Sequence, residues 1–116
     1  PVTSPDAVVR LREEITRVHV SEEVRRYIVS LVNRVRHDSE VLMGPSPRAT
    51  VALLKGSRVL AFLEGRDFVL PDDVKALALP VLAHRIHMKS DAEMDGVSPQ
   101  SVVEKSLRET AVPKPT

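Results

Sequence analysis

The sequence has 116 residues, of which 42% are hydrophobic and 28% charged, a composition that suits one folded domain rather than a disordered segment. Seventeen basic residues against sixteen acidic ones leave a formal net charge of +1, which does not favour nucleic acid as a partner. The chain has no cysteine, so disulfides and Cys-based zinc sites are excluded, and no apolar run approaches the roughly 20 residues that a membrane span needs. We therefore expect a cytoplasmic protein with an aliphatic core and no membrane partner.

The first third of the chain predicts two amphipathic helices. The chain begins at Pro1 rather than Met, so we expect a piece of a longer protein. Ser4-Pro5-Asp6 is typical of a helix start, with a cap, a proline and an acid in order. Ser21 caps the second helix. Apolar residues recur at three- and four-residue spacing in both helices: Val8, Leu11, Ile15 and Val18, then Val24, Tyr27, Ile28, Leu31, Val32 and Val35.

A loop over residues 38–47 precedes a third predicted helix, which starts at Ser46-Pro47 and ends near Glu64, before Gly65. This helix is apolar on more than one face, which predicts neighbours on several sides. Phe68-Val69 forms a short extended connector, and a fourth helix opens at Pro71. Pro80 lies inside the fourth helix and predicts a kink or break there.

The end of the chain predicts a polar linker over residues 90–97 and a short helix starting at Ser98-Pro99, followed by an extended tail with Pro113 and Pro115. The predicted fold class is all-α, a small bundle of about five helices. Residues 1–89 form the helical bundle, and residues 98–116 contribute the last helix and tail to the same domain.

The sequence lacks the machinery of a nucleotide hydrolase. A P-loop needs the pattern G-x-x-x-x-G-K-S/T after a strand, and the chain has no such segment. Asp72 and Asp73 could suggest paired-carboxylate catalysis, but at a helix start they complement the helix dipole. We predict no catalytic residue, no metal site and no ATP hydrolysis by this chain alone.

The segment Gly44-Pro45-Ser46-Pro47-Arg48-Ala49 is the strongest candidate site. It puts Arg48 in the first turn of a helix, where a cation is unfavourable unless an anion lies in front of it. Backbone amides and a guanidinium could then grip one phosphate together, with Ser46 and Pro47 as support. A solvated surface arginine remains the alternative.

Several spaced motifs together resemble the C-terminal lid of MoxR-type AAA+ ATPases. They occur in the family's order: Val20-Ser21-Glu22, Tyr27-Ile28, Gly44 to Ala49, Gly65-Arg66-Asp67-Phe68-Val69, Pro71-Asp72-Asp73-Val74, His84-Arg85-Ile86, Gly96-Val97-Ser98-Pro99 and Val112-Pro113. The resemblance covers most of the chain except its first dozen residues and far tail. Leu70 departs from it, since a serine or threonine cap is expected before Pro71.

The resemblance implies a helical lid that follows a nucleotide-binding core domain. It implies that Arg48 is the sensor-2 arginine facing the terminal phosphate of ATP, whose Mg²⁺ and phosphates the core mainly binds. It further implies ATP hydrolysis by the full-length protein, ring assembly with neighbouring subunits, often as hexamers, and chaperone-like remodelling of partners with von Willebrand factor A domains, including metalloenzyme maturation systems.

Other interpretations of the sequence stay open. The domain could be a free-standing helical adaptor that binds a protein partner in an apolar groove. A DNA-binding helix-turn-helix ranks behind it, because no helix shows a concentrated basic face. His84 and His87 could share a helical face as metal ligands, although structural or surface roles are simpler. Arg66 and Asp67 could contact the core domain or stabilise a turn.

Overall fold

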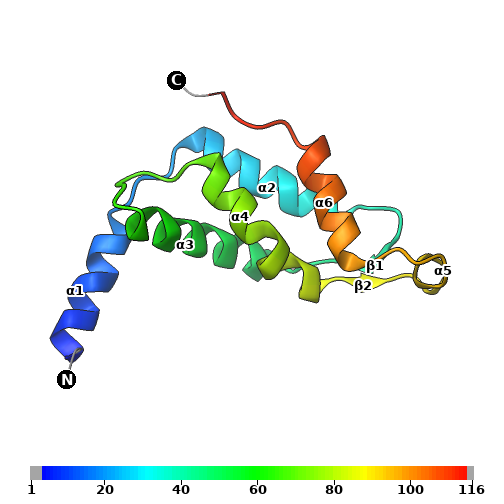
Figure 1. The fold of residues 1–116 in the computed structure, drawn as a ribbon, viewed down its shortest axis with the longest axis horizontal. Helices are drawn as coiled ribbons and strands as arrows, with labels where there is room; N and C mark the ends of the chain where they lie inside the picture. Colours follow the sequence, from blue (N-terminus) through cyan, green and yellow to red (C-terminus); the bar gives the residue numbers. More distant parts are fainter. Residues whose placement is uncertain (1–3, 115–116) are drawn as a thin grey trace.

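The computed structural model describes residues 4–114, which fold mainly into helices around one aliphatic core (Figure 1). The elements are α1 (Pro5–Thr16), α2 (Glu22–Arg36), β1 (Val41–Met43), α3 (Pro47–Leu63), α4 (Pro71–Leu82), the 3-10 turn η1 (Ala83–Arg85), β2 (His87–Met88), α5 (Ser90–Met94) and α6 (Pro99–Glu109). The all-α class is confirmed. The long helices lie where the apolar spacing predicts them, and the short helix α5 is an addition to the expected five.

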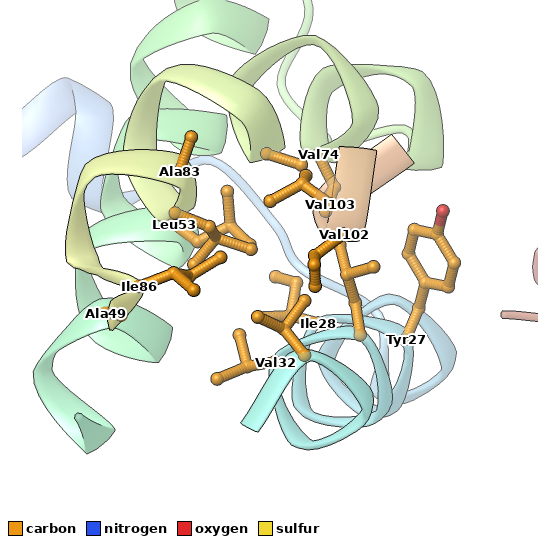
Figure 2. Close-up of a cluster of buried hydrophobic side chains, with 14 of the residues drawn as sticks. Tyr27, Ile28, Val32, Ala49, Leu53, Val74, Ala83, Ile86, Val102 and Val103 are labelled. Atoms are coloured by element: carbon orange, nitrogen blue, oxygen red, sulfur yellow. The ribbon is translucent and has the colours of Figure 1, made fainter. Parts of the chain in front are cut away.

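The core lies where α2, α3, α4 and α6 meet (Figure 2). All six apolar positions predicted for α2 are buried. Three leucines, Leu31, Leu53 and Leu82, are fully buried, and each contributes about 1.5–3 kcal/mol of hydrophobic stabilisation. Val102 and Val103 bring α6 into the same cluster. Helix α6 is therefore a structural part of the bundle.

Side-chain caps explain several of the helix starts. The hydroxyls of Ser4, Ser21 and Ser98 each accept a hydrogen bond of 3.2 Å from a backbone N–H three residues later. Leu70 cannot cap α4 with its side chain. Instead the Leu70 N–H donates to the Asp73 carboxylate at 2.7 Å, so the acid supplies half of a capping box.

Helix α1 differs from the other long helices because none of its residues is buried. It packs against α3 and extends away from the rest of the bundle (Figure 1). Its predicted apolar stripe is only partly covered: Val8 and Ile15 are partly buried, Leu11 is exposed, and Val18, which is buried, lies beyond the end of α1. The apolar face of α1 thus lacks a full partner among the described residues.

Two local expectations concern the loop after α2 and Pro80. The loop over residues 38–47 contains β1, which pairs antiparallel with β2 through Val41 and Met88, and Met43 and His87. These strands are too short to produce a recognisable alternation in sequence. Helix α4 continues through Pro80 but ends two residues later, at Leu82, where it passes into η1, so the α-helix stops near the proline rather than at it. A kink in α4 stays a prediction.

The remaining expectations concern α3 and the end of the chain. Helix α3 contacts α1, α2 and α4, as predicted. Its buried positions nevertheless follow one face at four-residue spacing, from Ala49 to Ala61, while Val51 and Leu63 are exposed. Residues 90–97, expected to be a polar linker, include α5 with Ala92 buried. Pro115, expected in the tail, lies outside the described residues, and the proposed domain division stays a prediction.

Within residues 4–114, no helix combines the length and apolarity required to cross a bilayer.

Candidate functional site

Arg48 lies in the first turn of α3 and is exposed. The first turn contains no acidic residue, and the Ser46 hydroxyl makes no capping hydrogen bond. Within residues 4–114, no ion pair engages the Arg48 guanidinium. An exposed cation therefore lies at the positive end of a 17-residue helix without local charge compensation. This arrangement favours binding of an external anion.

Buried residues on either side hold the exposed segment Ser46-Pro47-Arg48 in place. Pro45 is fully buried before it, and Ala49 is fully buried after it, next to Leu53 in the core (Figure 2). The Ser46 carbonyl accepts the Ala49 N–H at 2.9 Å, which closes the first turn. Ser46 and Pro47 are themselves exposed. The site is thus a rigid helix start rather than a loose loop.

Gly44 brings this segment directly against the last turn of α2. A Cβ atom at Gly44 would lie 2.7 Å from the Arg36 Cα, closer than real Cβ atoms approach backbone. The residue must therefore be glycine because of close packing, since its φ is not positive. The β1–β2 ladder ends at Met43, one residue earlier. The contact of Gly44 with the Arg36 backbone and the β1–β2 ladder together fix the segment that precedes Arg48.

The segment between α2 and Arg48 begins near Asp38. The Asp38 side chain is 4% exposed, and its carboxylate pairs with Lys105 of α6 at 2.9 Å. Asp38 Oδ1 also accepts the Glu40 N–H at 2.9 Å. Burial raises the pKa of the Asp38 carboxyl, but these bonds outweigh burial and the net pKa shift is downward. The sequence did not single out Asp38 or Lys105, because residues so far apart in the chain give no local pattern.

Arg66 and Asp73 form a second cluster at the start of α4. The two guanidinium nitrogens of Arg66 bind the two carboxylate oxygens of Asp73 at 2.6 and 2.8 Å. Arg66 also donates to the Phe68 carbonyl and to Glu64. The Asp67 carbonyl accepts the His19 N–H at 2.8 Å. In the described chain this cluster joins the connector after α3 to the starts of α2 and α4, which is a structural role.

The electrostatics of Asp73 agree with that role. Burial raises the pKa of its carboxyl, but the bonds from Arg66 and the Leu70 N–H outweigh burial and lower the pKa overall. The bond to Asp73, and after it the bond to Glu64, raises the pKa of the Arg66 guanidinium. Asp72, the other member of the acidic pair, is exposed. Because Asp73 is bonded to Arg66 and Leu70, the two acids do not act as a pair.

His84 and His87 do not share a helical face, because His84 lies in η1 and His87 in β2. Both are exposed. In the part of the chain that the structure describes, no group of three or more His, Asp or Glu side chains is arranged to hold a metal ion. The histidines remain surface residues in this structure.

Comparison with known proteins identifies the domain. The family model of the AAA lid domain matches residues 33–106, well over half of the chain. This chain belongs to the AAA lid domain family. The matched range contains the Arg48 segment, the Arg66–Asp73 cluster and most of α6.

Relatives over the whole chain place this lid among MoxR-type proteins. It is 31% identical to the chaperone MoxR1 of Mycobacterium tuberculosis, over 97% of the chain and 32% of MoxR1. It is 32% identical to the uncharacterized protein YeaC of Bacillus subtilis, over 97% of the chain and 35% of YeaC. The protein MoxR of Paracoccus denitrificans is 36% identical over 60% of the chain and 24% of MoxR.

A crystal structure agrees with this assignment. A candidate ATPase from Cytophaga hutchinsonii superposes with a TM-score of 0.89 and 35% identity, over 94% of the lid and 36% of that protein. The lid therefore spans about a third of the length of the proteins that it matches. It is a MoxR-type AAA+ lid domain, and the family does not favour the alternative of a free-standing adaptor.

Proposed function

We propose that this lid closes over ATP bound by an AAA+ core domain and that Arg48 contacts the terminal phosphate. The observation that carries the proposal is the exposed guanidinium at the start of α3, which has no ion-pair partner within residues 4–114, on a segment held by buried Pro45 and Ala49. Ser46 and Pro47 support the site by setting the direction of the first turn. ATP and Mg²⁺ bind mainly to the core, and the lid adds one positive charge at the phosphate that is transferred.

The core domain of the same protein is the first proposed partner. The half-covered apolar stripe on α1, which includes Leu11 and Ile15, supports a contact with a further domain. Leu42 and Met43 supply more exposed apolar surface, 71% and 65% exposed, directly before Gly44. Covering this surface near the bound nucleotide would couple lid closure to ATP binding.

The full-length protein is proposed to act as a chaperone-like ATPase in the cytoplasm. The name of one relative, the chaperone MoxR1 of Mycobacterium tuberculosis, supports this class. We propose that neighbouring subunits form a ring, such as a hexamer, and that the ring remodels partners with von Willebrand factor A domains, including metalloenzyme maturation systems. The lid would pass nucleotide-dependent closure to the next subunit.

Steady-state ATP turnover by the intact protein tests the role of Arg48. Arg48→Ala should lower turnover at least about tenfold, because it removes a charge-assisted contact to the reacting phosphate. Lys55→Ala is the matched control, since Lys55 is an exposed cation on α3, seven residues and about 10 Å further along the helix. Turnover equal in Arg48→Ala, Lys55→Ala and the unaltered protein would refute the proposal.

A further inference from the structure

The loop that leads to Arg48 begins with Asp38, which forms an ion pair with Lys105 of α6. Asp38 follows the end of α2, and Lys105 lies in the middle of α6. The Lys105 ammonium is 2.9 Å from Asp38 Oδ2, and the aspartate side chain is 4% exposed. A carboxylate this buried needs a compensating cation, because an unpaired buried charge is strongly unfavourable.

Asp38 also organises the backbone that follows it. Its Oδ1 accepts the Glu40 N–H at 2.9 Å, and its backbone carbonyl accepts the Val41 N–H at 3.1 Å. These two bonds turn the chain into β1. The Glu40 carbonyl accepts the Lys89 N–H at 3.0 Å, which continues the ladder with β2. The turn that Asp38 forms therefore leads directly into the pairing of β1 with β2.

Between β1 and Arg48, packing contacts hold the chain in place. Val41 is buried, Gly44 touches the Arg36 backbone, and Pro45 is fully buried before the start of α3. A shift of the turn at Asp38 would disturb either the β1 register or the contact at Gly44. Both contacts precede the exposed turn that carries Arg48.

We propose that Lys105 is a positioning residue for the nucleotide contact, holding the Asp38 turn so that the loop presents Arg48 to the terminal phosphate. The inference rests on the proposed function of Arg48. It gives α6 a second task besides closing the core. The bond to Asp38 is the first cause of the raised pKa of Lys105, and a lysine ammonium is charged at neutral pH without any shift.

A general tether between helices would look different. Arg34 of α2 and Glu109 of α6 form another ion pair, 3.2 Å long, which joins the two helices themselves rather than α6 and the loop after α2. Both side chains are about half exposed, at 46% and 49%, and neither bonds to the loop. Such an exposed pair contributes little to stability. Arg34→Met is therefore a control that removes a link from α6 to α2 and leaves both residues of the Asp38–Lys105 pair in place, although Glu109 also acts on Lys105 through its charge.

The test is a double-mutant cycle on the intact protein, with the dissociation constant for a non-hydrolysable ATP analogue as the readout. Lys105→Met should weaken binding about fivefold to thirtyfold, which corresponds to the conformational entropy of fixing the backbone of about one loop residue when the nucleotide binds. In the Arg48→Ala background the same change should have no further effect, because the residue it positions is gone. Lys105→Arg should retain near-normal affinity, and Arg34→Met should bind like the unaltered protein.

The outcomes separate the two proposals. Equal weakening by Lys105→Met with and without Arg48 would overturn the positioning role, since a general loss of structure acts in both backgrounds. Normal affinity of Lys105→Met beside a weakened Arg48→Ala would also overturn it and leave the role of Arg48 intact. Normal affinity of Arg48→Ala would overturn both. If Lys105→Met fails to fold, Asp38→Asn, which keeps the acceptor for the Glu40 N–H, takes its place in the cycle.

Discussion

Replacing Asp73 by alanine should destabilise the lid more than any other single change at the start of α4. The variant loses both bonds to Arg66, at 2.6 and 2.8 Å, and the 2.7 Å bond that caps the helix. Removing one partner of a buried pair costs about 3–5 kcal/mol, and loss of a helix cap costs about 1 kcal/mol. Arg66 is 19% exposed and can turn toward solvent, so we expect the broken pair to cost less than this range, about 2 kcal/mol, and the total to be about 3 kcal/mol.

Urea denaturation followed by circular dichroism at pH 7 measures this effect. A slope of about 1.5 kcal/mol per molar urea converts the loss into a midpoint lower by about 2 M. Asp72→Ala is the matched control, because Asp72 is the neighbouring acid and is exposed. That control should lose about 0.3–1 kcal/mol of dipole interaction. Equal midpoints for the two variants would refute the structural role assigned to Asp73.

Three further predictions use the same denaturation assay. Gly44→Ala should lower stability by about 1–3 kcal/mol, because its Cβ would meet the Arg36 backbone at 2.7 Å. The control Gly56→Ala should be near neutral, since the new methyl meets only the movable Leu77 side chain at 3.0 Å. Equal losses of stability in the two variants would contradict this. Asp38 and Asp73 have lowered pKa values in the folded state, so the stability they provide is present above about pH 4 and is lost as pH falls through the folded-state pKa. Asp73→Asn should make this acid-side loss shallower, and an unchanged pH profile would count against the pKa assignment. Tyr27→Phe should leave stability unchanged or raise it by up to about 1 kcal/mol, because the buried Tyr27 hydroxyl has no hydrogen-bond partner among the described residues. A loss of stability above about 1 kcal/mol would mean that the hydroxyl has a partner.

Local patterns in the sequence were sufficient to predict the long helices, but not the five-residue helix α5. The six buried positions of α2 follow helical periodicity, and the serine caps at Ser4, Ser21 and Ser98 mark helix starts by chemistry that acts over three residues. Arg48 could be singled out for the same reason, since its position relative to the start of α3 is a local property. Its contact with a phosphate stays a prediction.

Long-range contacts could not be predicted in this way. The β1–β2 ladder joins Val41 to Met88, and the Asp38–Lys105 pair joins the end of α2 to α6. Each depends on how the helices pack, and neither leaves a pattern within a window of the sequence. Pro80 is a local signal, and α4 ends two residues after it, at Leu82, before η1.

The most direct test of the central claim compares two nucleotides on the intact protein. Isothermal titration calorimetry would give dissociation constants for a non-hydrolysable ATP analogue and for ADP, with Arg48→Ala and the control Lys55→Ala. If Arg48 contacts the terminal phosphate, Arg48→Ala should weaken the ATP analogue about 10- to 100-fold and ADP by less than about threefold, because ADP lacks the group that Arg48 binds. Equal effects on both nucleotides, or no effect on either, would contradict the account.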